Sequence, residues 1–173
     1  ARGTIEGRSI HPAPEMRMAV THTRKDLFKN LRRAGKSPSY IAGQLKSKFG
    51  AGATSIARIF KSGGISASST IKTLRKKMST STNSAANIVK NVFNIWKKAR
   101  IASALKSAGY SLKNIARTAK GNLNMSTAAL LRCLKESGGQ GNKGAARIMK
   151  RARMELHAIL DAGRKTFRWS LNR

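Results

Sequence analysis

The sequence feature that most constrains the fold is an internal repeat at a spacing of 74 residues. The stretch "AGKSPSYIA" (34–42) matches "AGYSLKNIA" (108–116) at its Ala-Gly, Ser and Ile-Ala positions. The match then runs on to "FKSGG" (60–64), which meets "LKESGG" (134–139) with one inserted residue. A fixed spacing of this kind indicates that one structural unit occurs twice. The matched pairs include Leu31 and Leu105, Ser37 and Ser111, Ile41 and Ile115, Phe49 and Leu123, Ile56 and Leu130, and Phe60 and Leu134.

A shorter unit recurs inside this duplication. A helical pattern ends in an apolar residue, small or basic residues and a Gly follow, and a Ser precedes the next helical pattern. Leu31 and Phe60 are 29 residues apart, as are Leu105 and Leu134, and "ILDAGRKTF" (159–167) repeats the helix end once more. The pattern predicts four or five stacked helical units of this kind.

The first copy contains Gly-Lys-Ser (35–37), which also ends the phosphate-binding loop of many nucleotide-binding proteins. That loop needs a second Gly five residues earlier, where this chain has Asn30. The second copy replaces Lys36 by Tyr110, so the phosphate ligand is not repeated. The recurring residues are those that stop a helix and cap the next one. We therefore predict that this motif is structural.

No segment alternates apolar and polar residues as a strand does, and the apolar periods are helical. We predict an all-α fold of short packed helices, which form a duplicated helical-hairpin array with an extended N-terminal arm. The expected parts are the arm (1–20), a first repeat unit (21–107) and a second unit with a basic tail (108–173). Residues 1–8, which contain "IEGR", resemble an expression tag or a processing remnant. After a first helix that ends near Gly35, helices are expected over about 38–48, 54–62, 69–78, 84–107, 111–119, 126–136 and 143–161.

The charge of the chain limits its partners. The chain has 36 Lys and Arg against 6 Asp and Glu, a formal net charge of +30. Between Leu27 and Lys135 there are 22 basic residues and no acidic one, so these charges repel one another. They need an external polyanion, and nucleic acid, either DNA or RNA, is the first expectation. An anionic membrane surface and an acidic capsid protein are the alternatives, and oligomer formation stays open.

The cations that we expect to contact phosphates lie outside the apolar stripes of the expected helices. Helical surfaces normally carry acidic partners at i+4, and these are absent here. The spread of the cations over many helices favours packaging or coating of a polyanion, in a virion interior, a nucleoid or a nucleus. A ribonucleoprotein or capsid subunit is the alternative structural role. The predicted binding residues are Lys25, Lys29, Arg32, Arg33, Lys46, Lys48, Arg58, Lys72, Arg75, Lys76, Lys77, Lys90, Lys97, Lys98, Arg100, Arg117, Lys120, Arg147, Lys150, Arg151 and Arg153.

Little in the sequence points to an enzyme, a metal or a cofactor, and we expect none of these. The three histidines are far apart and lack the spacing of metal ligands, and carboxylates are scarce. Cys133 lies in an apolar helical pattern, which predicts a buried thiol. No apolar run is long enough to span a membrane. Base stacking on aromatic side chains is possible in principle, but Tyr40, Tyr110 and Trp96 have helical spacing that favours the core.

Overall fold

The computed structural model describes residues 23–136 and 139–167, and all of its secondary structure in these ranges is helical. The all-α prediction is confirmed. The expected N-terminal arm and basic tail lie outside the described residues, and the division at 107/108 stays a prediction. In chain order the helices are α1 (Arg24–Arg33), α2 (Pro38–Phe49), α3 (Ala53–Ser62), α4 (Ala67–Met78), α5 (Thr82–Asn91), α6 (Lys98–Ser107), α7 (Leu112–Gly121), α8 (Thr127–Glu136), α9 (Asn142–Arg151) and α10 (Leu156–Phe167).

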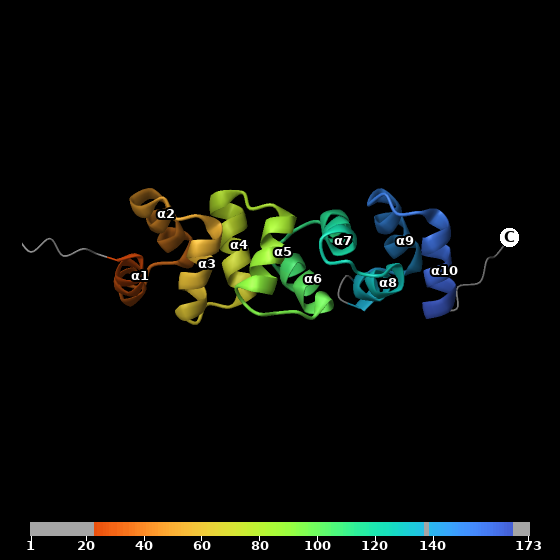
Figure 1. Cartoon of the computed structure of the whole chain (residues 1–173), viewed down its shortest axis with the longest axis horizontal. Helices are drawn as coiled ribbons and strands as arrows, with labels where there is room; N and C mark the ends of the chain where they lie inside the picture. Colours follow the sequence, from red (N-terminus) through yellow and green to blue (C-terminus); the bar gives the residue numbers. More distant parts are fainter. Residues whose placement is uncertain (1–22, 137–138, 168–173) are drawn as a thin grey trace, which may run out of the picture.

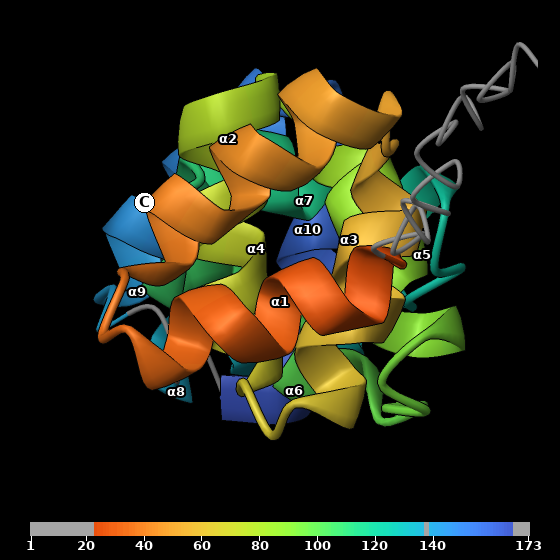
Figure 2. The ribbon, with the colours of Figure 1, turned by 90° about the vertical axis from the view of Figure 1, so that its left-hand side faces the viewer.

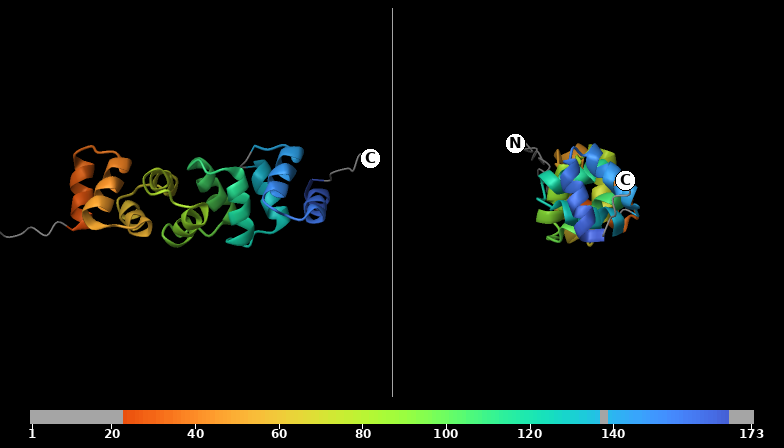
Figure 3. Two further views of the ribbon diagram at one scale, coloured as in Figure 1. Left: turned by 90° about the horizontal axis from the view of Figure 1, so that it is seen from above. Right: turned by 90° about the vertical axis from the view of Figure 1, so that its right-hand side faces the viewer.

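The helices follow one another along the long axis of the molecule, from α1 at one end to α10 at the other (Figure 1). Each helix packs mainly on the helices one and two places away along the chain. Contacts between helices two places apart join α2, α4 and α6 in one row and α5, α7 and α9 in another. The views from the two ends and from above show the same elongated stack (Figures 2 and 3). Such an array buries its core between neighbouring units, as solenoid proteins do.

Each of the nine linkers between these helices contains a residue with positive φ. The N–H group of the next residue turns back to the helix: Ile65 N donates to Phe60 O at 2.9 Å, and Tyr110 N donates to Leu105 O at 3.1 Å. This is the Schellman arrangement, in which a left-handed residue ends a helix and satisfies its last carbonyl groups. The left-handed residues are Gly35, Gly50, Gly64, Ser79, Asn94, Gly109, Asn124, Gly139 and Arg153.

The spacing of these left-handed residues explains the sequence repeat. They recur every 14 or 15 residues, so the smallest recurring unit is one helix with its linker. Two units give the 29-residue spacing, and five units give the 74-residue shift, which places α1 on α6 and α2 on α7. Gly-Lys-Ser has the structural role predicted for it, because Gly35 is left-handed and the Ser37 hydroxyl accepts the Tyr40 N–H at 3.3 Å.

The expected helix over 84–107 is wrong, because two helices, α5 and α6, occupy this range. Asn94 between them has a φ of 57°, which ends the first helix. The sequence shows neither Gly nor Pro here, and Asn is one of the few other residues that adopt this conformation at low cost. The apolar period continued across the break and concealed it.

The expected helix over 143–161 is wrong for the same reason. The chain forms α9 and α10 in this range, and Arg153 between them has a φ of 61°. An Arg in the left-handed region has no local sequence signature, so only the 15-residue spacing of the linkers could have revealed this break.

The helices begin at side-chain caps and pack through small apolar residues. Thr23 and Asp26 form a capping box at α1, and Ser66, Ser81 and Ser111 cap α4, α5 and α7. Cys133 is buried, as predicted. Among the described residues, no helix has the length and apolar character needed to cross a membrane. Fully buried side chains include Phe60, Ile41, Leu45, Ile56, Ile71, Leu74, Ile101, Leu105, Leu130, Leu131, Leu134 and Met149.

The α4–α5 linker offers a test of this linker geometry. Ser79 has a φ of 49°, and Ser81, two residues later, caps α5. Ser79→Gly should raise the free energy of unfolding by about 1 kcal/mol, because Gly adopts the left-handed conformation without steric cost. Ser81→Gly makes the same chemical change and should lower it by a few tenths, about 0.3 kcal/mol. Urea denaturation measures both, and equal effects of the two substitutions would contradict the assignment.

Candidate nucleic-acid interface

The predicted binding residues all lie in the described part of the chain, and all but one are exposed. The exception is Lys90 on α5, which is half-buried. The residues are spread over α1 to α7, α9 and the linkers before α6 and α10, so they form no single compact patch. An extended partner with regularly spaced negative charge matches such a distribution.

Three of these cations have partners inside the protein. The Arg75 Nη1 donates to the Ala108 carbonyl oxygen at 3.0 Å, and the Lys98 Nζ donates to the Asn124 carbonyl oxygen at 2.8 Å. The Arg117 Nη2 lies 3.5 Å from the Arg151 carbonyl oxygen, which it contacts as a donor. All three acceptors belong to the end of a later helix or to its linker, where the helix dipole favours positive charge. These cations therefore link neighbouring units of the stack.

Two further cations act in the same way, and the sequence analysis did not single them out. The Lys61 Nζ donates to the Val92 carbonyl oxygen at 2.6 Å, and the Arg24 Nη2 donates to the Phe49 carbonyl oxygen at 3.5 Å. Arg24 corresponds to Lys98 in the 74-residue shift, so both copies place a cation on a neighbouring helix end. This correspondence is the one sequence signal that could have identified them.

Arg75 also contacts Tyr110, at the centre of the stack. The guanidinium carbon lies 5.2 Å from the ring centroid, and the Tyr110 hydroxyl donates to the Thr80 carbonyl oxygen at 2.5 Å. Burial raises the pKa of Tyr110, while the charge of Arg75 opposes the rise. The neutral phenol is therefore the form that stabilises the fold, and its contribution is lost as the pH rises through that raised pKa.

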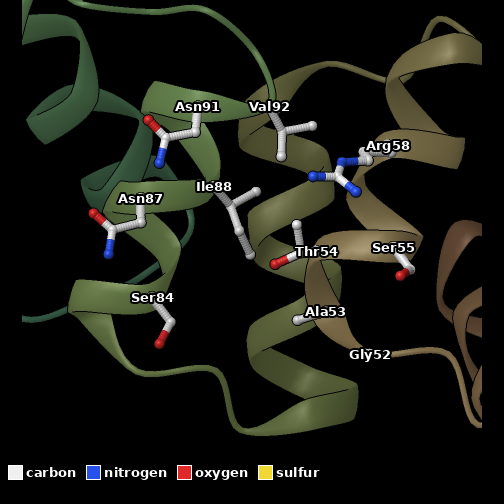
Figure 4. A pocket seen from close by; sticks show the side chains of 10 residues that line it. All are labelled: Gly52, Ala53, Thr54, Ser55, Arg58, Ser84, Asn87, Ile88, Asn91 and Val92. Atoms are coloured by element: carbon white, nitrogen blue, oxygen red, sulfur yellow. The ribbon is translucent and has the colours of Figure 1, made fainter.

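A polar groove of about 470 Å³ lies between α3 and α5. Figure 4 shows Arg58 on the α3 side of this groove and Asn87 and Asn91 on the α5 side, with Ile88 and Val92 between them. A guanidinium, side-chain amides and hydroxyl groups are suitable donors for phosphate oxygens. Arg58 was predicted from the sequence, whereas the groove's neutral polar residues were missed because they carry no charge signal. The groove is lined by Gly52, Ala53, Thr54, Ser55, Arg58, Ser84, Asn87, Ile88, Asn91 and Val92.

Two aromatic residues that we expected in the core lie on the surface. Trp96 is 63% exposed and Tyr40 is 47% exposed, so the prediction of a core position is wrong for both. Trp96 follows the break at Asn94, which removes it from the expected helix stripe, and Tyr40 lies in the first turn of α2. Tyr110 is partly buried, in agreement with the prediction.

The described residues contain no group of three or more His, Cys, Asp or Glu that could hold a metal ion. No protein-family model matches the chain, and no curated protein and no solved structure matches it significantly.

Proposed function

We propose that this protein is a non-enzymatic nucleic-acid-binding protein that packages or organises DNA or RNA. The observation that carries the proposal is the run of 22 cations without an acidic residue between Leu27 and Lys135. In α1 to α7 these cations are mostly exposed, and few of them have a partner within the protein. Neutralisation by phosphates releases condensed counterions and supplies affinity without any reading of sequence.

The shape of the described chain supports the same proposal. The helices form an elongated stack, so the cations are distributed along a length rather than gathered at one point (Figure 1). A long polyanion can contact many of them at once, and each contact adds to the affinity. This arrangement suits coating or condensation in a virion interior, a nucleoid or a nucleus.

The test compares partner classes at equal salt. The purified full chain is mixed at about 150 mM salt with duplex DNA, structured RNA, anionic vesicles and an acidic protein, and equilibrium affinities are measured. We expect one of the two nucleic acids to bind more tightly than the vesicles and the acidic protein. Stronger binding to structured RNA assigns a ribonucleoprotein role, and stronger binding to duplex DNA assigns a packaging role.

The opposite ranking would overturn the proposal. Tighter binding to vesicles would identify a membrane-interacting protein with basic amphipathic helices. Tighter binding to the acidic protein would identify a capsid or scaffold subunit.

A further inference from the structure

The α5–α6 linker contains one residue more than the common linker pattern. In the other eight linkers between the described helices, the next helix begins three residues after the left-handed residue, as Leu112 follows Gly109. After Asn94 the helix begins four residues later, at Lys98. Ile95 keeps the usual contact, since its N–H donates to the Val89 carbonyl oxygen at 3.3 Å, and Lys97 stands at the N-cap. The additional residue between them is Trp96.

Trp96 contributes little to the packing of the stack. Its side chain is 63% exposed, the largest fraction among the exposed large hydrophobic residues. The Lys90 Nζ lies over the ring, 5.0 Å from its centroid, and this cation–π contact restricts the orientation of the ring. An indole that is held in place but left open to solvent is a suitable surface for stacking with another flat ring.

The charges beside Trp96 indicate what kind of ring this is. Lys97 and Arg100 are exposed on either side of Lys98, which donates to Asn124. No acidic residue lies between Leu27 and Lys135, so the ligand has to combine a flat ring with negative charge. An unpaired nucleobase in a polynucleotide meets both requirements, because its face stacks on the indole while the flanking phosphates meet the cations.

We propose that Trp96 is a stacking platform for an unpaired base, and that Lys97 and Arg100 contact the phosphates beside that base. This inference rests on the proposed function and adds a preference for single-stranded segments over duplex. A lipid surface fits the structure less well, because insertion requires a continuous apolar area. The other exposed large hydrophobic residues, Tyr40 and Leu156, lie on α2 and α10, at the two ends of the stack (Figure 1).

The test uses the fluorescence of Trp96 in the full chain. Trp169→Phe removes the other tryptophan, so the emission reports Trp96 alone. Oligo(dT) and a duplex of equal length are titrated separately, and labelled forms of both give the affinities by anisotropy. We expect oligo(dT) to quench the emission and the duplex to leave it nearly unchanged, because only an unpaired base can stack on the ring.

Variants separate stacking from general apolar contact. Trp96→Leu should weaken oligo(dT) binding about tenfold, whereas duplex binding should change less than about twofold. Trp96→Phe keeps a ring and should restore most of the loss. Leu156→Ala removes another exposed apolar side chain and should change neither affinity. Circular dichroism verifies that each variant keeps its helices.

The outcomes distinguish this inference from the proposed function. Binding of both nucleic acids without quenching by oligo(dT), or with equal loss of affinity for duplex in Trp96→Leu, would overturn the stacking platform and leave phosphate binding intact. A larger change in emission with anionic vesicles than with oligo(dT) would also overturn it. Absence of binding to either nucleic acid at about 150 mM salt would overturn the proposed function itself.

Discussion

Gly109→Ala is expected to lower the free energy of unfolding by about 2–4 kcal/mol, because two effects add at this position. Gly109 has a φ of 86°, and a left-handed conformation costs an alanine about 1–2 kcal/mol. A Cβ atom there would also lie 2.3 Å from the Arg75 Nη1, so the guanidinium has to move away. The displaced Arg75 loses its hydrogen bond to the Ala108 carbonyl and its contact with Tyr110, which adds about 1–2 kcal/mol.

The corresponding glycine of the first copy provides the matched control. Gly35 has a φ of 68°, and no atom lies within 4 Å of the position that a Cβ would take. Gly35→Ala should therefore cost only the backbone part, about 1–2 kcal/mol. In an Arg75→Ala background, Gly109→Ala should fall to the same value, because the contact has already been removed. Equal costs of the two glycine substitutions in the wild-type background would show that Arg75 does not link α4 to α6.

Neutralising three lysines of α4 is expected to weaken nucleic-acid binding strongly. Lys72, Lys76 and Lys77 are exposed, and glutamine keeps most of each side chain while removing its charge. If all three contact phosphates, the slope of log affinity against log salt should become shallower by about 0.9 for each lysine. At about 150 mM salt this corresponds to an affinity loss of roughly 10- to 100-fold, measured by anisotropy with a labelled duplex or RNA.

Arg75 on the same helix is the control for this experiment. Arg75→Gln also removes a charge, but its guanidinium is engaged with the Ala108 carbonyl oxygen. This substitution should lower the unfolding free energy and change the salt slope by less than half of the per-lysine value, below about 0.4. An unchanged slope in the triple lysine variant would place the phosphate contacts elsewhere on the stack.

The helical class and most of the helix limits could be predicted from the sequence because Gly and Ser mark most of the linkers. The predictions failed where other residues do the same work. Asn94 and Arg153 end helices in the left-handed conformation, and the apolar period continues across both breaks. Spacing was the more reliable signal than residue type, because a linker recurs every 14 or 15 residues whichever residue occupies it.

The candidate interface was predictable only in part. Charge alone identifies which residues are cations, and the structure places nearly all of the predicted ones at the surface. The sequence could not show that Arg75, Lys98 and Arg117 reach carbonyl groups 33, 26 and 34 residues further along the chain, because those contacts depend on how the units stack. The exposure of Trp96 was hidden for a similar reason, since it depends on a helix end that the sequence pattern did not reveal.

The most direct test of phosphate binding is the salt dependence of the affinity of the unmodified full chain for nucleic acid. Affinities for duplex DNA and structured RNA are measured between about 50 and 500 mM salt, and log affinity is plotted against log salt concentration. We predict a slope of about −5 or steeper for at least one of them, which corresponds to several phosphates neutralised at once. A slope shallower than about −2 for both, or no binding at about 150 mM salt, would contradict the proposal that the exposed cations serve to bind nucleic acid.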